Sequence, residues 1–216
     1  MSDARVGVLA LQGAFREHRH ALERQGADVQ EVRLPEQLEG LAGLIIPGGE
    51  STTMAKLICN YGFDEALPVF YQTGAAIWGT CAGAITIARE IVGYPEQLHL
   101  NLIDMAVERN AYGRQVASFE VEVTLEAAFK AGLSAASASS ASASAASTES
   151  ADQPFHTIFI RAPRIASVGK DVTVLAEHAG DPIMVAQGRV MATVFHPELA
   201  ADDRIHQYFL EQLVAG

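Results

Sequence analysis

Short apolar runs of strand length alternate with helical stretches through the first ninety residues of the chain. The predicted strands are residues 6–11, 29–34, 44–47 and 75–78. The predicted helices are residues 15–25, 51–61 and 82–90, the second with Ser51 as its N-cap. Because the strands are apolar on both faces, they indicate a parallel sheet with helices on each side. With right-handed crossovers, this pattern predicts a doubly wound, three-layer α/β/α sandwich.

The second half of the chain predicts further strands joined by short turns. They are residues 119–125, 157–160, 172–176, 183–187 and 190–194. Gly188 and Arg189 indicate a tight hairpin between the last two strands, and residues 202–214 a closing helix. We therefore expect one α/β domain over residues 1–216, whose mostly parallel central sheet carries antiparallel additions.

One segment interrupts this pattern, because residues 134–150 are almost wholly Ser and Ala. Without large apolar side chains it buries too little surface to offset chain entropy. Alanine favours helix, but the interleaved serines weaken that preference. We expect a mobile, solvent-facing insertion over residues 134–153, with no functional role.

Composition excludes several kinds of partner. The 15 basic and 26 acidic side chains give a net charge of −11, whereas nucleic acid or an anionic membrane would need a basic face. The acidity is explained by solubility alone. No apolar run approaches the ~20 residues of a membrane span, and no secretory signal opens the chain. Two cysteines form no disulfide framework, so a reducing, cytoplasmic location is expected.

Residues 79–83 (GTCAG) lie where a predicted parallel strand turns directly into a helix. Such a turn is sharp, and its glycines let neighbouring backbone approach closely. It places Cys81 at the carboxyl end of a strand, where open α/β sheets bind ligands and the helix start favours a thiolate. A packed core cysteine explains this pattern equally well when it is taken alone. Cys59 has no such context and is expected to be a buried structural thiol.

His196 and Glu198 follow the apolar run 190–195, at the exit of a predicted strand. Residues i and i+2 of an extended segment point the same way, and Pro197 fixes the backbone between them. The carboxylate then holds one imidazole nitrogen and leaves the other to act as a base toward Cys81. Alone, the segment would be a surface turn. Together with the cysteine turn, it predicts a Cys–His–Glu triad.

A glycine loop, residues 47–51 (PGGES), follows the third strand and opens a helix. Its backbone N–H groups are a candidate anion cradle. With the N–H of Ala82, they would receive the oxyanion that forms when Cys81 attacks a carboxamide. The alternative is an ordinary glycine turn capped by Ser51. It is not a Walker loop, because no Gly-Lys-Ser/Thr follows.

Taken together, these three motifs resemble the class I (triad-type) glutamine amidotransferases. More narrowly, the chain is similar almost end to end to the glutaminase subunit of pyridoxal 5′-phosphate synthase. The segments that carry this resemblance are Leu11-Gln12-Gly13-Ala14, residues 47–53, Glu108-Arg109-Asn110, Gly113-Arg114-Gln115 and residues 159–163 (FIRAP). The fold implied is flavodoxin-like, and only the Ser/Ala-rich insertion departs from the family pattern.

The resemblance implies roles for individual residues. Cys81 would attack L-glutamine, form a glutamyl thioester and expel ammonia. His196 would be the general base and then the acid, oriented by Glu198. Residues implied to line the glutamine pocket are Gly49, Glu50, Ser51, Arg109, Ile160 and Arg161, and those implied to form the oxyanion hole are Gly48, Gly49 and Ala82. Arginine is suited to clamp an α-carboxylate, although Arg161 could instead pair with an acidic neighbour.

The family also implies a partner, a PdxS-type synthase subunit that receives the ammonia within a large hetero-oligomeric complex. Glutaminase activity would stay low until that partner docks and completes the oxyanion loop near Gly48 and Gly49. The coenzyme belongs to the partner, so no cofactor is expected here. No metal is expected either. The histidines without metal-ligand spacing, expected at the surface or in loops, are His18, His20, His99, His156, His178 and His206.

Two other functions remain open from the residues alone. A triad glutaminase could serve another pathway, such as histidine, purine or anthranilate synthesis, but residues 11–14 and 159–163 speak against it. A non-catalytic thiol sensor or chaperone on the same architecture would need an exposed reactive cysteine, but no His-x-Glu pair at a strand exit.

Overall fold

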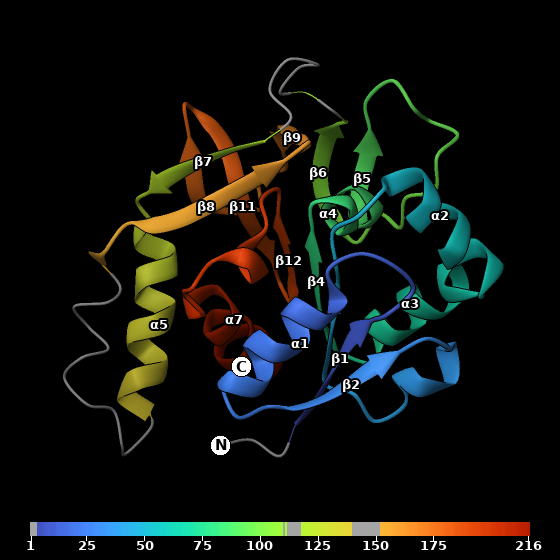
Figure 1. The fold of residues 1–216 in the computed structure, drawn as a ribbon, viewed down its shortest axis with the longest axis horizontal. Coiled ribbons are helices and arrows are strands. Elements are labelled where there is room, and N and C mark those ends of the chain that lie inside the picture. The colour runs from blue at the N-terminus through green and yellow to red at the C-terminus, as the bar shows by residue number, and fades with distance from the viewer. Residues whose placement is uncertain (1–3, 110, 112–117, 140–151) are drawn as a thin grey trace.

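The computed structural model describes residues 4–109, 111, 118–139 and 152–216, with the backbone alone for residues 134–139 (Figure 1). Its central sheet has seven strands in the spatial order β10-β11-β12-β4-β3-β1-β2. In chain order these are β1 (Arg5–Leu9), β2 (Asp28–Val32), β3 (Gly43–Ile46), β4 (Ala76–Thr80), β10 (Thr173–His178), β11 (Asp181–Gln187) and β12 (Val190–Thr193). From β2 to β12 the strands pair in parallel, and β11 and β10 extend one edge antiparallel. The predicted mostly parallel sheet with antiparallel additions is confirmed.

Helices cover both faces of this sheet (Figure 1). On one face lie α1 (Phe15–Arg24), α7 (Arg204–Tyr208) and the π-helix η3 (Phe209–Val214); on the other lie α2 (Ser51–Asn60), α3 (Phe63–Gln72) and α4 (Ala82–Ile87). Successive side chains of a strand point to opposite faces of the sheet, so Trp78 and Gly79 of β4 face the two different helix layers. The Trp78 ring lies 4.9 Å from that of His206 in α7. A Cβ added to Gly79 would lie 2.5 Å from the carbonyl oxygen of Gly83 in α4.

Two smaller sheets and three further helices complete the described part of the chain. The sheets are β5 (Ala88–Ile91) with β6 (Ile103–Glu108) and β9 (Arg164–Val168), and β7 (Ser118–Val123) with β8 (Phe155–Ile160). The helices are η1 (Pro35–Leu38), η2 (Pro197–Leu199) and α5 (Ala127–Ser139). The His196 N–H donates to the Ile158 carbonyl of β8 at 2.8 Å. This bond joins β8 to the segment that leaves β12.

Two predicted helices differ from the structure. The helix expected over residues 82–90 ends at Ile87, and the chain continues as β5, which pairs with β6. Its β-branched residues Ile85, Thr86 and Ile87 weaken a helix, and pairing with β6 offers the backbone other partners. The closing helix expected over residues 202–214 begins at Arg204 and changes to π-helix from Phe209.

The predicted N-cap of α2 is also wrong. Ser51 is the first helical residue, and Glu50 is the cap, with its carboxylate accepting from the N–H groups of Thr52 and Thr53. Among the described elements, the ones without a counterpart in the prediction are η1, α3, β6, α5, β9 and η2. Pro68 lies inside α3, where proline normally interrupts a helix.

The Ser/Ala-rich segment begins as regular structure. Helix α5 runs to Ser139, so residues 134–139 have helical backbone rather than the expected loop. Upstream of them, Phe129 and Leu133 are buried, and the Phe129 ring stacks on Tyr208 at 4.5 Å. This packing provides the anchor that the Ser/Ala composition lacks. Residues 140–151 lie outside the described residues, so the expected mobility stays a prediction.

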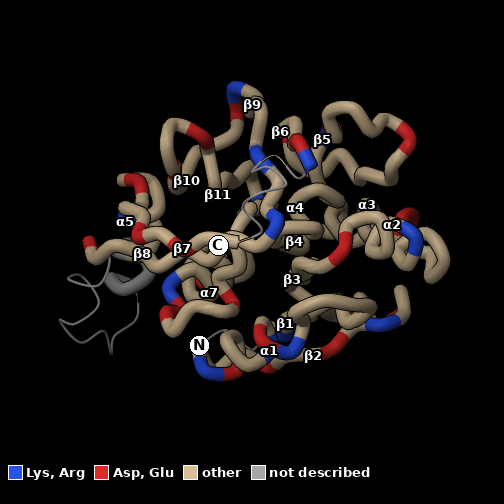
Figure 2. The backbone as a smooth tube through the Cα atoms, turned by 45° about the horizontal axis from the view of Figure 1, so that its top comes forward, with Lys and Arg blue, Asp and Glu red and all other residues tan. Residues whose placement is uncertain are grey.

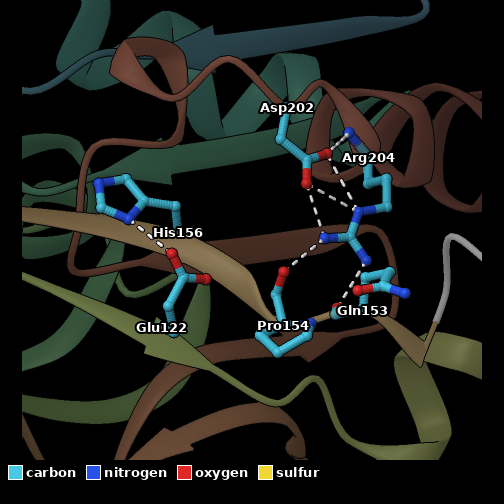
Figure 3. Close-up of polar contacts among 6 residues, drawn as sticks. All are labelled: Glu122, Gln153, Pro154, His156, Asp202 and Arg204. Atoms are coloured by element: carbon cyan, nitrogen blue, oxygen red, sulfur yellow. Dashed lines mark hydrogen bonds and ion pairs between the residues drawn. The ribbon is translucent and has the colours of Figure 1, made fainter.

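Arg204 ties the start of β8 to α7 (Figure 3). Its guanidinium donates to the carbonyl oxygens of Gln153 and Pro154 at 2.9 and 3.1 Å and forms an ion pair with Asp202 at 2.6 Å. Arg204 is largely buried, so these charge-assisted bonds are stronger than surface ones. The chain is therefore held firmly where β8 begins.

Charged residues lie mainly on the outer helices and loops, with both signs interspersed (Figure 2). The central strands β3 and β4 contain none. Within the described ranges, no helix has the length and apolarity that crossing a membrane requires.

Candidate active site

Cys81 lies in a tight turn between β4 and α4. Its φ is 49°, a left-handed conformation that residues with a side chain rarely adopt. Its N–H donates to the carbonyl of Thr193 in β12 at 2.8 Å. A Cβ on Gly83 would lie 2.0 Å from the carbonyl oxygen of Ile46. Only glycine therefore permits α4 to start so close to β3, as the sequence pattern predicts.

His196 faces the Cys81 side chain across the glycine loop. A Cβ on Gly48 would lie 2.6 Å from His196 Cε1 and 3.2 Å from Cys81 Cβ, so the two side chains approach the same point. The Cys81 side chain raises the pKa of the imidazole, and the thiol donates to the carbonyl of Ile160 at 3.9 Å. His196 Nδ1 lies 2.8 Å from Glu198 Oε1, and both residues are buried. Thiol, imidazole and carboxylate thus form one connected chain.

The environment keeps a proton on His196 and off Glu198. Burial alone lowers the pKa of His196, but the bonds to Cys81 and Glu198 outweigh it and raise the pKa to about 10. Burial also opposes ionisation of Glu198, yet His18 and His196 hold the pKa of that carboxyl below its usual value. An imidazolium beside a carboxylate is therefore favoured at neutral pH.

A cavity of about 240 Å³ opens onto the sulfur and the imidazole. Its lining residues are Gly49, Glu50, Ser51, Cys81, Ala82, Ile85, Arg109, Ile160, Arg161 and His196. All of the site residues predicted from the sequence are among them except Gly48 and Glu198, which lie directly behind His196. Ile85, from the buried face of α4, is the one lining residue that the sequence did not indicate.

The carboxylate of Glu50 is fully engaged in capping α2. It accepts from Thr52 N at 2.9 Å and from both N and Oγ1 of Thr53 at 2.7 Å, and these bonds lower its pKa to about 2. Its backbone is held by Gln12, whose Nε2 donates to Glu50 O at 2.9 Å and whose Oε1 accepts from Glu50 N at 3.3 Å. Gln12 had no separate role in the sequence prediction; in the structure it fixes the loop that follows Gly49.

Two arginines provide positive charge at the cavity. Arg109 donates to Thr52 Oγ1 at 3.2 Å and to Gln97, and its guanidinium lies 4.5 Å from the centre of the Tyr94 ring. Arg161 is exposed, with φ at 44°, and forms no ion pair with any acidic residue in the described part of the chain. Both fit a carboxylate-bearing ligand. Of the other motif residues, Asn110 and 113–115 lie outside the described residues.

Two of the three candidate oxyanion donors line the cavity, and the third does not. Gly49 and Ala82 line the cavity, whereas Gly48 packs against His196. Gly49 has φ at 157° and a Cβ there would meet Gln12 at 2.7 Å, so this loop requires glycine.

Three predictions about other residues are wrong. Cys59 is exposed, because the buried face of α2 consists of Ser51, Met54, Ala55 and Ile58. His18 and His206 are fully buried rather than superficial. His18 shares the buried face of α1 with Ala21 and Leu22, a helical spacing that the sequence displays. Within the described residues, no cluster of His, Cys, Asp and Glu could hold a metal ion.

Comparison with known sequences gives consistent matches over nearly the whole chain. Residues 8–215 match the sequence pattern of the SNO glutamine amidotransferase family. The "Pyridoxal 5'-phosphate synthase subunit PdxT" of Thermus thermophilus is 51% identical over 207 residues, which span 95% of this chain and 96% of that protein. The protein of the same name from Deinococcus radiodurans is 49% identical over 209 residues, spanning 95% of each.

Solved structures agree with the fold. One described as "Crystal structure of glutamine amidotransferase" is 48% identical, with a TM-score of 0.82 over 98% of this chain and 99% of that chain. "Structure of PurLQS from Thermotoga maritima" is 17% identical, with a TM-score of 0.66 over 96% and 97%. At that identity the likeness is one of fold alone.

Proposed function

We propose a reaction sequence on one premise: the chain belongs to the SNO glutamine amidotransferase family. By close homology to the pyridoxal 5′-phosphate synthase subunits, it is a glutaminase that supplies ammonia to that synthase. The same homology implies a PdxS-type partner. The residues around the cavity divide the steps of this chemistry among them.

L-Glutamine binds in the 240 Å³ cavity with its carboxamide at Cys81. Arg109 and Arg161 are the cations available to bind its α-carboxylate, and Arg109 is already oriented by Thr52 and Tyr94. The Glu50 carboxylate accepts the hydrogen bonds of the helix cap and is not free to bind glutamine. Glu50 therefore contributes to the pocket mainly by the fixed position of its backbone.

The thiol proton of Cys81 is the one that makes His196 an imidazolium, and the sulfur left without it attacks the carboxamide carbon. The negative charge that develops on the carboxamide oxygen is received by N–H groups from Gly49, Ala82 and the loop at Gly48. Collapse breaks the carbon–nitrogen bond, and the His196 imidazolium gives its proton to the departing nitrogen as ammonia. A glutamyl thioester remains on Cys81.

Water then attacks the thioester carbonyl and loses a proton to His196. The carbon–sulfur bond breaks, glutamate leaves, and the resting state is restored. Glu198 keeps Nδ1 of His196 protonated and the ring oriented, so that the other nitrogen serves sulfur, leaving group and water in turn.

Ammonia passes to a PdxS-type synthase in a large hetero-oligomeric complex, and docking completes the oxyanion loop at Gly48 and Gly49. Gln12 holds the Glu50 end of that loop through two hydrogen bonds. A partner that contacted Gln12 would therefore also affect the position of the loop. No cofactor takes part in this proposed sequence.

The observation that carries the proposal is the approach of His196 and Cys81 to one point beside Gly48, with both residues lining the cavity. It is tested by a glutaminase assay on the chain with and without its co-expressed synthase. Cys81→Ala and His196→Asn should lower kcat by about 10⁴-fold or more, and Glu198→Gln by less.

The matched control is Cys59→Ala, which removes the exposed thiol and should leave kcat unchanged. Release of glutamate by Cys81→Ala at the wild-type rate in the presence of synthase would refute the triad.

A further inference from the structure

A second line of polar side chains lies behind the triad carboxylate. Its members are His18 of α1, Thr80 at the end of β4 and His206 of α7, and all three are fully buried. His206 and Thr80 contact His18, and His18 contacts Glu198, whose side chain is also fully buried. Such groups are costly to bury unless they are paired, so their arrangement calls for a physical explanation.

The second carboxylate oxygen of Glu198 faces His18. Oε1 is taken by His196, whereas Oε2 forms no hydrogen bond of standard geometry within the described residues. The Nε2 atom of His18 lies 3.3 Å from Oε2 and 3.2 Å from Thr80 Oγ1. The contact with Thr80 has hydrogen-bond geometry, and the Glu198 carboxylate lies beside the same nitrogen at ion-pair distance.

His206 determines where the His18 proton lies. The two rings contact through His18 Nδ1 and His206 Nε2 at 2.9 Å, which requires one proton between them. Nδ1 of His206 has no partner within the described residues. A buried N–H without an acceptor is rarer than a bare acceptor, so we assign the His206 proton to Nε2. His206 then donates to His18, and His18 carries its own proton on Nε2.

Both rings are neutral at pH 7. Burial is the main cause of the lowered pKa of His18, with Glu198 opposing it and His196 adding to it. Burial also lowers the pKa of His206 well below its usual value, assisted by His18 and Arg24. The charged or titratable groups that face this pair are Glu198 and His196 at η2, Glu17 and Arg24 of α1, and the two histidines themselves. His18 thus meets Glu198 as a neutral N–H donor.

We propose that His18 is a positioning residue for glutamine hydrolysis, which aims the Glu198 carboxylate at His196 through its Nε2–H and is itself oriented by His206. This inference rests on the proposed function, because it takes His196 as the base. The triad would then extend from Cys81 through α1 to α7, and the helix that covers the sheet would contribute to catalysis.

The first test compares His18→Leu with His18→Gln in the complex with synthase. Leucine removes the donor, so kcat should fall by about 10- to 100-fold, as is typical when a group that orients a catalytic ligand is lost. KM for glutamine should stay within about twofold, because His18 does not line the cavity. Glutamine can place its amide N–H near the former Nε2, so His18→Gln should recover a large part of kcat.

The pH profile separates positioning from packing. The imidazolium of His196 protonates the leaving group, and Glu198 helps to raise its pKa. When the carboxylate is less well aimed, the alkaline limb of the kcat profile should move to lower pH in His18→Leu and less so in His18→Gln. A role in packing alone would leave that limb in place. The matched control is His20→Leu, an exposed histidine of the same helix, which should behave as wild type.

A measurement on the wild-type chain needs no variant to fold. Nitrogen-15 NMR of labelled histidine rings should show His18 and His206 neutral and protonated on Nε2 at pH 7. An Nδ1-protonated or charged His18, or a His18→Leu enzyme with wild-type kcat and pH profile, would overturn the proposal. Neither result would affect the assignment of Cys81, which stands or falls with Cys81→Ala.

Discussion

Two residues at this site have strained backbone conformations, whose cost in free energy must be offset by contacts elsewhere in the fold. Cys81 has φ at 49° and Arg161 φ at 44°, and each such strained residue costs about 1–3 kcal/mol. Both lie on the cavity wall. The bond from Cys81 N to Thr193 O and the close packing of Gly83 on β3 hold the cysteine turn in place. These two strained positions both lie where the backbone brings a side chain to the cavity.

Glu50 provides a stability test at this scale. Its pKa in the native state is about 2, against an ordinary value of 4.5. A lowered native-state pKa stabilises the protein above the unfolded-state pKa, and the contribution is lost as pH falls toward 2. Glu50→Gln should therefore lower the free energy of unfolding by about 1 kcal/mol at pH 7.

Urea unfolding of both proteins at pH 7 and pH 3 measures this effect. The difference between wild type and Glu50→Gln should shrink at pH 3. Glu36→Gln, at an exposed carboxylate, controls for loss of charge and should show almost no difference at either pH. An equal difference at both pH values would show that the cap does not depend on the ionised carboxylate.

The residues proposed to act directly on glutamine could be predicted from the sequence, but the residues that hold them in place could not. Cys81, His196 and Glu198 lie in short local motifs, so neighbouring residues reveal them. His18 and Gln12 reach the site through contacts with residues far along the chain, Glu198 and Glu50. The burial of His18 was visible in its helical spacing with Ala21 and Leu22, but its partners depend on how α1 packs over η2.

At the scale of elements, the junction of β4 and α4 is the part on which the site depends. Gly83 lies in α4, where alanine would normally favour the helix by about 1 kcal/mol. Here the added Cβ would meet Ile46 O at 2.0 Å. Gly83→Ala should therefore lower the free energy of unfolding by about 1–3 kcal/mol and also reduce kcat, since the turn at Cys81 must shift.

Thermal unfolding and the glutaminase assay on the same preparation check this prediction. A variant as stable and as active as wild type would mean that α4 can move away from β3 without disturbing Cys81.

Sequence patterns located the central strands to within a few residues, because most of them contain a run of apolar residues; β2 (DVQEV) is the least apolar. They missed β6 and β9. In the structure β6 pairs with β5 on one side and with β9 on the other. They also extended α4 through residues that belong to β5. Such pairings join segments distant in the chain, and local propensity does not record them. Local composition also failed to predict the helical backbone of residues 134–139. That helix begins upstream, where Phe129 and Leu133 are buried and Phe129 stacks on Tyr208 of α7.

For the whole molecule, the topology accounts for the site. Strands β3, β4 and β12 are parallel neighbours, so the segments that leave their carboxyl ends meet at one edge of the sheet. These segments carry the glycine loop, Cys81 and His196 in turn. The second half of the chain adds β8, which brings Ile160 and Arg161 to the other side of the same cavity. One edge of the sheet thus brings together the proposed nucleophile, the proposed base and a cavity lined by two arginines.

The central claim is that a glutamyl thioester forms on Cys81 when glutamine is hydrolysed for the synthase. The most direct measurement is mass spectrometry of the complex, quenched in acid during turnover and digested. We predict a glutamyl adduct on the peptide that contains Cys81 and none on the peptide that contains Cys59, whose thiol pKa is raised by partial desolvation and by the charge of Asp64. Sustained turnover with Cys81 unmodified, or an adduct on Cys59 in its place, would contradict the account.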